Sequence, residues 1–170
     1  MGILAIRKSF DNNKGVTIIE VLIVIAICGI LAAISTGPLL RWRANKFVEE
    51  NANYLISDIE RAKIEAIRRN TNIRIAFFND DGSTSTGSFT QYQVGRIVGA
   101  GGVGDDVVLW ERSFATRLAA STDTSTLVFT PRGIIQGPTG TFVFSDTRRA
   151  DLKRRVTVSR LSLVTSSTTN

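Results

Sequence analysis

Hydrophobic and polar positions divide this chain into regions with different patterns. Between Val16 and Leu40, Glu20 is the only strongly polar side chain. A helix needs roughly 20 residues to cross a bilayer, and this apolar run is longer than that. We therefore expect residues 16–40 to form a transmembrane helix.

The helical pattern continues past this run, but along one face only. Apolar residues recur at spacings of three and four, namely Val48, Ala52, Leu55, Ile59, Ala62 and Ala66. Such spacing places them in one stripe on a helix. We expect an amphipathic helix over residues 41–70. Gly37 and Pro38 should kink the chain between the two parts, because proline removes a backbone donor and crowds the preceding turn.

After Asn70 the pattern changes to alternating and β-branched residues separated by turn-rich pieces. It predicts strands over residues 72–78, 89–98, 107–114, 126–130, 141–144 and 155–164. Strands that follow a helix, without alternating with it, favour an antiparallel α+β head over residues 71–170. Residues 165–170 are polar, and we expect them to be frayed.

The amino-acid composition limits the kinds of function that the chain can have. The chain has no histidine, which removes the commonest general base and metal ligand. Its single cysteine, Cys28, lies in the apolar run, so no intramolecular disulfide can form. We expect no enzyme, no catalytic or metal site and no cofactor. The net charge is +6, and without residues 1–15 it is +4, a mild excess that is compatible with solubility alone.

The start of the apolar run resembles a known family. Gly15-Val16-Thr17-Ile18-Ile19-Glu20, followed by the hydrophobic helix, is similar to the cleavage and methylation site of type IV pilins and of type II secretion pseudopilins. The resemblance implies that residues 1–15 are a leader peptide. A prepilin peptidase would cut between Gly15 and Val16 and methylate the new amine of Val16.

Glu20 is the residue that this resemblance explains best. A charge inside a membrane-length helix costs roughly 2.5–3.5 kcal/mol on insertion scales, so it needs a partner. The resemblance implies that Glu20 pairs with the N-terminal amine of a neighbouring subunit during filament assembly. Two alternatives remain: Glu20 snorkels passively to the interface, or the run is an ordinary secretory signal with a mature start at Thr36.

The C-terminal half carries a second resemblance. Residues 129–133, 140–144 and 155–158 are similar to the β-region of GspH-like minor pseudopilins and related minor pilins. The implied protein is a minor pilin of a type IV pilus, a structural subunit that primes assembly or sits at the filament tip. The alternatives are an H-type minor pseudopilin of type II secretion and a DNA-binding or adhesive minor pilin.

The same resemblance implies where the protein works and with what. It would be a single-pass inner-membrane protein with a periplasmic head, incorporated into a pilus or pseudopilus. Its partners would be other pilin or pseudopilin subunits, the prepilin peptidase/methyltransferase and an inner-membrane assembly platform.

Two further motifs have competing interpretations. Residues 99–104 fit the dinucleotide pattern GxGxxG, but a strand-like segment follows where that fold needs a helix, so we interpret them as a hairpin connection. The densest basic cluster comprises Arg148, Arg149, Lys153, Arg154 and Arg155. It is either a solvated strand edge or a DNA contact. DNA grooves often carry aromatic residues, and residues 146–170 contain none, which favours the solvated edge.

Overall fold

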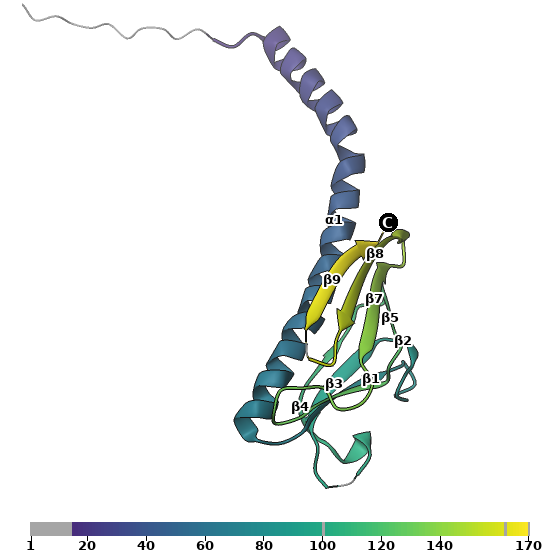
Figure 1. The fold of residues 1–170 in the computed structure, drawn as a ribbon. Helices are drawn as coiled ribbons and strands as arrows, with labels where there is room; N and C mark the ends of the chain where they lie inside the picture. Colours follow the sequence, from purple (N-terminus) through teal and green to yellow (C-terminus); the bar gives the residue numbers. More distant parts are fainter. Residues whose placement is uncertain (1–14, 100, 162, 170) are drawn as a thin grey trace, which may run out of the picture. The chain divides into compact units, whose positions relative to one another are not determined.

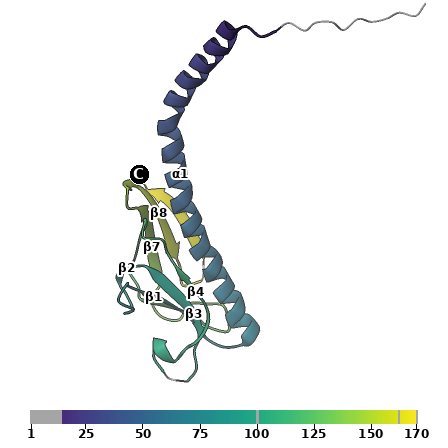
Figure 2. The same cartoon turned by 180° about the vertical axis from the view of Figure 1, so that it is seen from behind.

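The structure is a computed structural model that describes residues 15–99, 101–161 and 163–169 (Figures 1 and 2). The chain divides into two compact units between Leu40 and Arg41. We call residues 16–40 the apolar rod and Arg41–Asn170 the head domain. Apart from Gly15, the expected leader peptide lies outside the described residues.

One helix, α1 (Ile18–Arg69), supplies both the rod and the first part of the head domain. Thr17 caps its N-terminus, since its backbone carbonyl and its Oγ1 both accept from the backbone N–H of Glu20. The spacing Thr17-x-x-Glu20 is that of a capping box. The helix therefore begins directly after the expected cleavage point, with Glu20 in its first turn.

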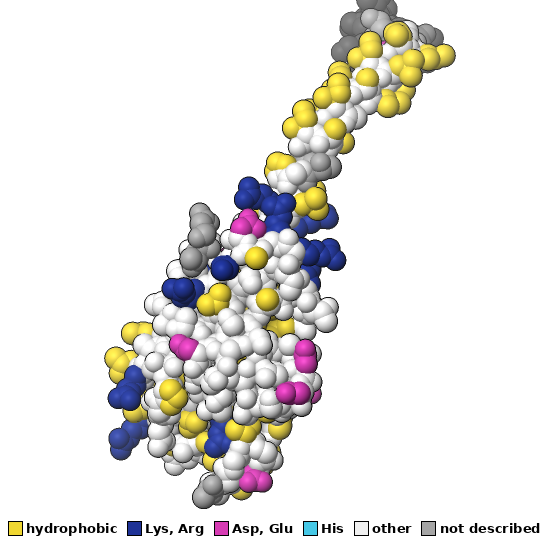
Figure 3. All heavy atoms as spheres, turned by 90° about the vertical axis from the view of Figure 1, so that its right-hand side faces the viewer, with side chains coloured by type: hydrophobic (Ala, Val, Ile, Leu, Met, Phe, Trp, Pro, Cys, Tyr) yellow, Lys and Arg dark blue, Asp and Glu magenta, His cyan; other side chains and the backbone are white. Residues whose placement is uncertain are grey.

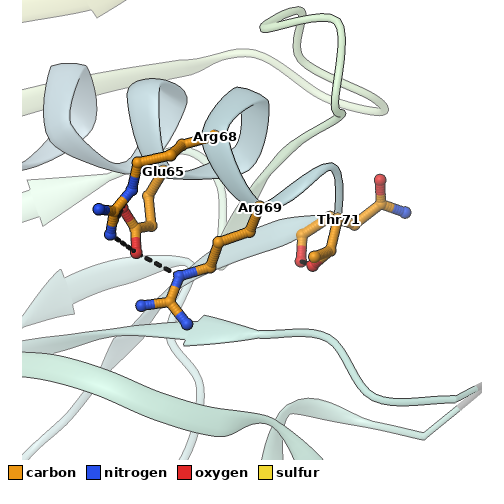
Figure 4. A network of polar contacts seen from close by, with 5 residues as sticks. Glu65, Arg68, Arg69 and Thr71 are labelled. Atoms are coloured by element: carbon orange, nitrogen blue, oxygen red, sulfur yellow. Dashed lines mark hydrogen bonds and ion pairs between the residues drawn. The ribbon is translucent and has the colours of Figure 1, made fainter.

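The C-terminus of α1 is fixed just as firmly. Asn70 adopts a left-handed conformation at φ 51°, and the N–H groups of Asn70 and Thr71 donate to the carbonyls of Ile67 and Ala66. This pair of bonds is a Schellman motif. In the last turn, Glu65 accepts from both Arg68 and Arg69, and the two cations complement the helix dipole (Figure 4).

Within the described residues, no single straight helix is long and apolar enough to cross a membrane. The two pieces Ile18–Ile34 and Gly37–Arg69 meet the requirement of length and composition when they are taken together. The second piece begins at Gly37, directly before Pro38.

The strands of the head domain form two antiparallel sheets (Figure 1). The first has the order β4 (Val107–Ser113), β3 (Gln91–Arg96), β1 (Ile73–Phe78), β6 (Thr126–Phe129). The second has the order β2 (Gly87–Phe89), β5 (Leu118–Thr122), β7 (Gly140–Asp146), β8 (Arg149–Val158), β9 (Val164–Thr169). The predicted α+β class with an antiparallel head is therefore confirmed.

The core lies between the sheets and the Arg41–Arg69 part of α1, which runs along their inner faces (Figure 2). The predicted stripe is confirmed, because each of its six residues is at most 3% exposed. Aromatic rings fill the space opposite it, with neighbouring centroids 4.8–6.2 Å apart: Phe77, Phe89, Tyr92, Phe114, Phe142 and Phe144. Burial of aromatic rings and a helix stripe on both sheets makes the head one cooperative unit.

Several strand predictions were wrong in their bounds or missed an element. β5 was not predicted, because its Leu-Ala-Ala-Ser-Thr sequence is poor in the β-branched and aromatic residues that mark strands. β2 is only three residues long. β8 begins at Arg149, well before the predicted 155, and a turn closed by the N–H of Ser159 and the carbonyl of Leu163 ends it early. The expected fraying of residues 165–170 was wrong for β9, which pairs along β8 as a polar edge strand.

Candidate functional site

The proposed processing site lies at the described N-terminus. Gly15 and Val16 are exposed and precede the helix. Glu20 is exposed in the first helical turn, and its backbone N–H is taken by Thr17. Thr17 is the residue that sequence reasoning missed here, and the Thr-x-x-Glu spacing was the signal that could have revealed it. The described geometry leaves the Glu20 carboxylate at the surface of the rod.

The surface around Glu20 is almost entirely apolar. Large hydrophobic side chains of the rod are 45–82% exposed, among them Ile18, Leu22, Ile25 and Leu39. Soluble monomeric proteins rarely expose contiguous apolar patches of more than a few hundred Å². A helix that is hydrophobic all round is covered by lipid or by other protein. The rod is therefore a binding surface in its own right.

The predicted basic cluster lies on the β7–β8 turn and along β8. Because side chains alternate across a strand, Arg154 lies on the face of the buried Val156, while Arg155 is exposed on the other face. Arg154 donates to the hydroxyls of Thr168 and Ser166 on β9, both at 3.3 Å. The five cations therefore do not form one continuous face.

The structure instead brings part of this cluster beside the first turns of the helix in the head domain. Arg41 forms an ion pair with Asp151 of β8 at 3.5 Å. A groove of about 210 Å³ lies next to it, lined by Trp42, Asn45, Lys46, Val48, Glu49, Leu152, Lys153, Arg154 and Thr168. In Figure 3, dark-blue side chains gather over this end of the head domain.

We call this assembly the basic collar: Arg41, Arg43, Lys46, Lys153, Arg154 and Arg155. Two carboxylates face it. Glu49 accepts from Lys46 at 2.9 Å, which lowers the pKa of Glu49, and Asp151 pairs with Arg41. The sequence-based cluster contained only the five cations from Arg148 to Arg155. Only the pairing of β8 beside the helix start joins it to the helix cations.

An ion pair between a buried carboxylate and a partly exposed arginine stabilises the same end of the head domain. Asp146 at the end of β7 is 0% exposed and accepts from Arg117 at 2.5 and 2.9 Å and from the backbone N–H of Arg148 at 2.9 Å. These bonds, led by that of Arg117, lower the pKa of Asp146. The Arg117 guanidinium also lies 5.1 Å from the Phe47 ring centroid on α1. The β7–β8 turn is thus held in place from two directions.

A second buried polar cluster holds the middle of the helix to the first sheet. Asp58 of α1 accepts from Tyr92 Oη at 2.6 Å and from Arg112 Nε at 3.1 Å. Burial, with the hydrogen bond to Asp58, raises the pKa of Tyr92 well above its ordinary value. The Arg112 guanidinium also covers the Tyr54 ring, 4.5 Å from its centroid. The carboxylate is satisfied on several sides, which suits a structural role.

The glycine-rich segment has the structure of a connection. Two of its described residues, Val103 and Gly104, belong to a three-residue 3₁₀ helix, η1 (Val103–Asp105), which leads into β4. A dinucleotide fold needs a full helix there. The described residues also contain no group of three or more His, Cys, Asp or Glu side chains that could hold a metal ion.

Comparison with known families finds matches to two parts of the chain. The family described as "Type II transport protein GspH" matches residues 51–162, and the prokaryotic N-terminal methylation motif matches residues 11–36. No curated protein matches the chain in sequence.

Solved structures show the same fold. The type IV minor pilin FimU of Pseudomonas aeruginosa, in one crystal form, is 18% identical with a TM-score of 0.55, over 70% of this chain and 91% of FimU. The minor pseudopilin EpsH from the type 2 secretion system of Vibrio cholerae is 10% identical with a TM-score of 0.54, over 71% of this chain and 96% of EpsH. The match over most of the head and the methylation motif together make this chain a member of the GspH family, a minor pilin or pseudopilin of the type IV pilus and type II secretion systems.

Proposed function

We propose that this chain is a minor pilin of a type IV pilus, a structural subunit that primes assembly or sits at the filament tip. A prepilin peptidase cuts it after Gly15 and methylates Val16. The mature form is anchored in the inner membrane by the apolar rod and holds its head in the periplasm. The observation that carries the proposal is an exposed apolar rod, bearing one carboxylate, joined to a GspH head.

Glu20 would guide assembly through charge neutralisation. Its carboxylate is exposed among apolar side chains, and a lone charge in a low-dielectric bundle is costly. The amine of Val16 on an adjacent subunit can relieve that cost when the rods pack side by side. Only one axial offset between neighbouring rods brings the two charges together, so the pair would set the stagger of the subunits. The head would then contact other minor subunits.

A second candidate is an H-type minor pseudopilin of a type II secretion system. The family description, which names type II transport, favours it. Both candidates share the same processing, anchoring and Glu20 pairing. They differ in the filament that the subunit joins, and so in what a deletion strain loses: surface pili in one case and protein export in the other.

Mass spectrometry of the mature N-terminus in native membranes tests the shared part. We expect a chain that begins at Val16 with one added methyl group. Gly15→Leu should leave the leader attached. Gly29→Leu, at an exposed glycine in the rod with open space around it, should be cut normally. A mature start at Thr36 would refute the proposal in favour of a secretory signal.

Filament incorporation tests the role of Glu20. We expect Glu20→Gln to abolish incorporation while processing continues, because the partner amine then lacks a counter-charge. Glu60→Gln, an exposed carboxylate on the helix in the head domain, is the matched control and should be incorporated normally. Equal incorporation of both variants would show that Glu20 has no assembly role.

A further inference from the structure

The basic collar lies within the head domain and begins at the residue that follows the apolar rod. Arg41 succeeds Leu40 directly, and Arg43 and Lys46 lie within the next two helical turns. Lys153 and Arg154 of β8 line the same groove as Lys46. Four cations, Arg41, Lys46, Lys153 and Arg154, therefore lie at or beside this groove with two carboxylates, and Arg43 and Arg155 are their neighbours in sequence. The two ion pairs there are exposed surface pairs, which contribute little and exchange partners easily.

Helix dimensions place the first residues of this collar at a defined depth. Residues 21–40 span about 30 Å as a helix, which matches the hydrocarbon thickness of a bilayer. If they cross the membrane, Glu20 and Arg41 fall at its two interfaces. The headgroup layer adds about 5–8 Å on each side, so residues 41–46 lie in or beside it.

Side-chain chemistry at the collar suits that layer. Trp42 is 58% exposed between Arg41 and Arg43, and tryptophan is enriched where membranes meet water. Arginine and lysine are the side chains that bind phosphate best.

We propose that the basic collar binds the headgroups of anionic phospholipids, so that the membrane-resident subunit docks its head domain on the bilayer surface. This inference rests on the proposed membrane anchoring. The β8 cations extend the ordinary flanking charges of a transmembrane helix into a surface contributed by two elements. Filament entry would exchange these lipid contacts for subunit contacts. DNA is the disfavoured ligand, because an anchored chain keeps the collar within the headgroup layer.

The test uses the full chain with Cys28→Ser, reconstituted in vesicles. A fluorophore is attached at Ala150→Cys, an exposed position on β8 beside Asp151, or at Gly102→Cys. The Gly102 loop lies at the far end of the head domain, where β3 pairs with the start of β1 after α1 ends, and it has open space for a side chain. The vesicles contain phosphatidylcholine alone or with phosphatidylglycerol, plus a lipid whose headgroup carries a nitroxide quencher.

We expect the Ala150→Cys reporter to be quenched more strongly in phosphatidylglycerol vesicles and the Gly102→Cys reporter to be unaffected. Each cation near an anionic surface changes the docking equilibrium about fivefold. The triple variant Arg43→Gln, Lys153→Gln, Arg155→Gln should therefore reduce quenching to its level in neutral vesicles. The triple variant Arg96→Gln, Arg132→Gln, Arg160→Gln removes the same charge from the other end and should change nothing.

The outcomes separate the two levels of inference. Equal quenching in both vesicle types, or equal loss in both triple variants, overturns the collar proposal while anchoring stands. Release of the chain from vesicles by an alkaline wash overturns anchoring itself, and the collar proposal with it. Duplex DNA that binds the chain in neutral vesicles and is lost only in the collar triple variant would show a nucleic-acid surface and overturn lipid docking.

Discussion

The two parts of α1 use hydrophobic residues in opposite ways. In the head domain, six residues on one face are buried against two sheets, and the other faces carry charge. In the rod, apolar side chains are exposed all round. The stripe is satisfied by its own chain, whereas the rod is satisfied only by lipid or other subunits. Hydrophobicity alone therefore says little about folding until its angular distribution is known.

The largest expected effect compares one substitution in both parts. Leu55→Ala in the stripe should cost roughly 2–5 kcal/mol of head stability, because Leu55 is 0% exposed and its removal leaves a cavity. Leu22→Ala in the rod, where Leu22 is 56% exposed, should change head stability by less than about 0.5 kcal/mol. Urea unfolding in mild detergent measures both. Similar losses of head stability in the two variants would contradict the difference between the buried stripe and the exposed rod.

The reverse experiment places a charge in the apolar rod. Ile25→Arg should reduce membrane integration by about 2.5–3.5 kcal/mol on an insertion scale. Ile25 is 62% exposed and has no role in the head core, so the urea midpoint of the head should not move. Ile25→Leu is the control and should behave as the native chain in both assays. Unfolding of the head by Ile25→Arg would mean that the two parts are not independent.

The ion pair of Asp146 with Arg117 sharpens the comparison through pH. Arg117→Met should cost about 1.5–3 kcal/mol at neutral pH, because Asp146 stays buried without its charged donor. In the native head, the pKa of Asp146 is lowered from its ordinary value of about 3.9. The ionised carboxylate therefore stabilises the head at pH values above about 3.9, and this stabilisation is lost as the pH falls through the folded pKa. The difference in free energy of unfolding between the variant and the native chain should thus become smaller as the pH is lowered. A difference that is constant with pH would rule out this origin. Arg132→Met, at an arginine outside the pair, is the control.

The smallest expected effects come from glycines with opposite surroundings. Gly133 adopts φ +73°, and a Cβ there would lie 2.8 Å from Ile67 Cδ1 on α1, so Gly133→Ala should cost about 1–2 kcal/mol. Gly29→Ala in the rod meets open space and should raise helix propensity by about 1 kcal/mol without moving the head's midpoint. Circular dichroism and urea unfolding distinguish the two. A head destabilised by Gly29→Ala would contradict the division.

Periodic features of the fold could be predicted from the sequence. The stripe from Val48 to Ala66, the apolar rod and most strands with β-branched residues have patterns that local geometry imposes. Strands such as β5 and β9 could not be predicted, because their small or polar residues form strands through pairing with β7 and β8. Pairing between distant segments has no local sequence signal.

The same limit applies to the candidate site. Gly15, Val16 and Glu20 form a local motif that sequence alone reveals, and their roles stay predictions. The basic collar could not be predicted, because Lys46 and Lys153 are distant in sequence and meet only when β8 lies beside α1. The partner of Asp58 was equally hidden, since Tyr92 and Arg112 come from two other strands.

The buried stripe also determines how the head responds to mechanical force. A pull on Arg41 along the helix axis reaches the head through side chains spread over about 27 Å, from Val48 to Ala66. Because the stripe runs parallel to that pull, the load shears all its contacts together and does not peel them apart one by one. Close-packed interiors transmit such strain with little give. A subunit tethered by its first helix can therefore bear tension through the same packing that folds it.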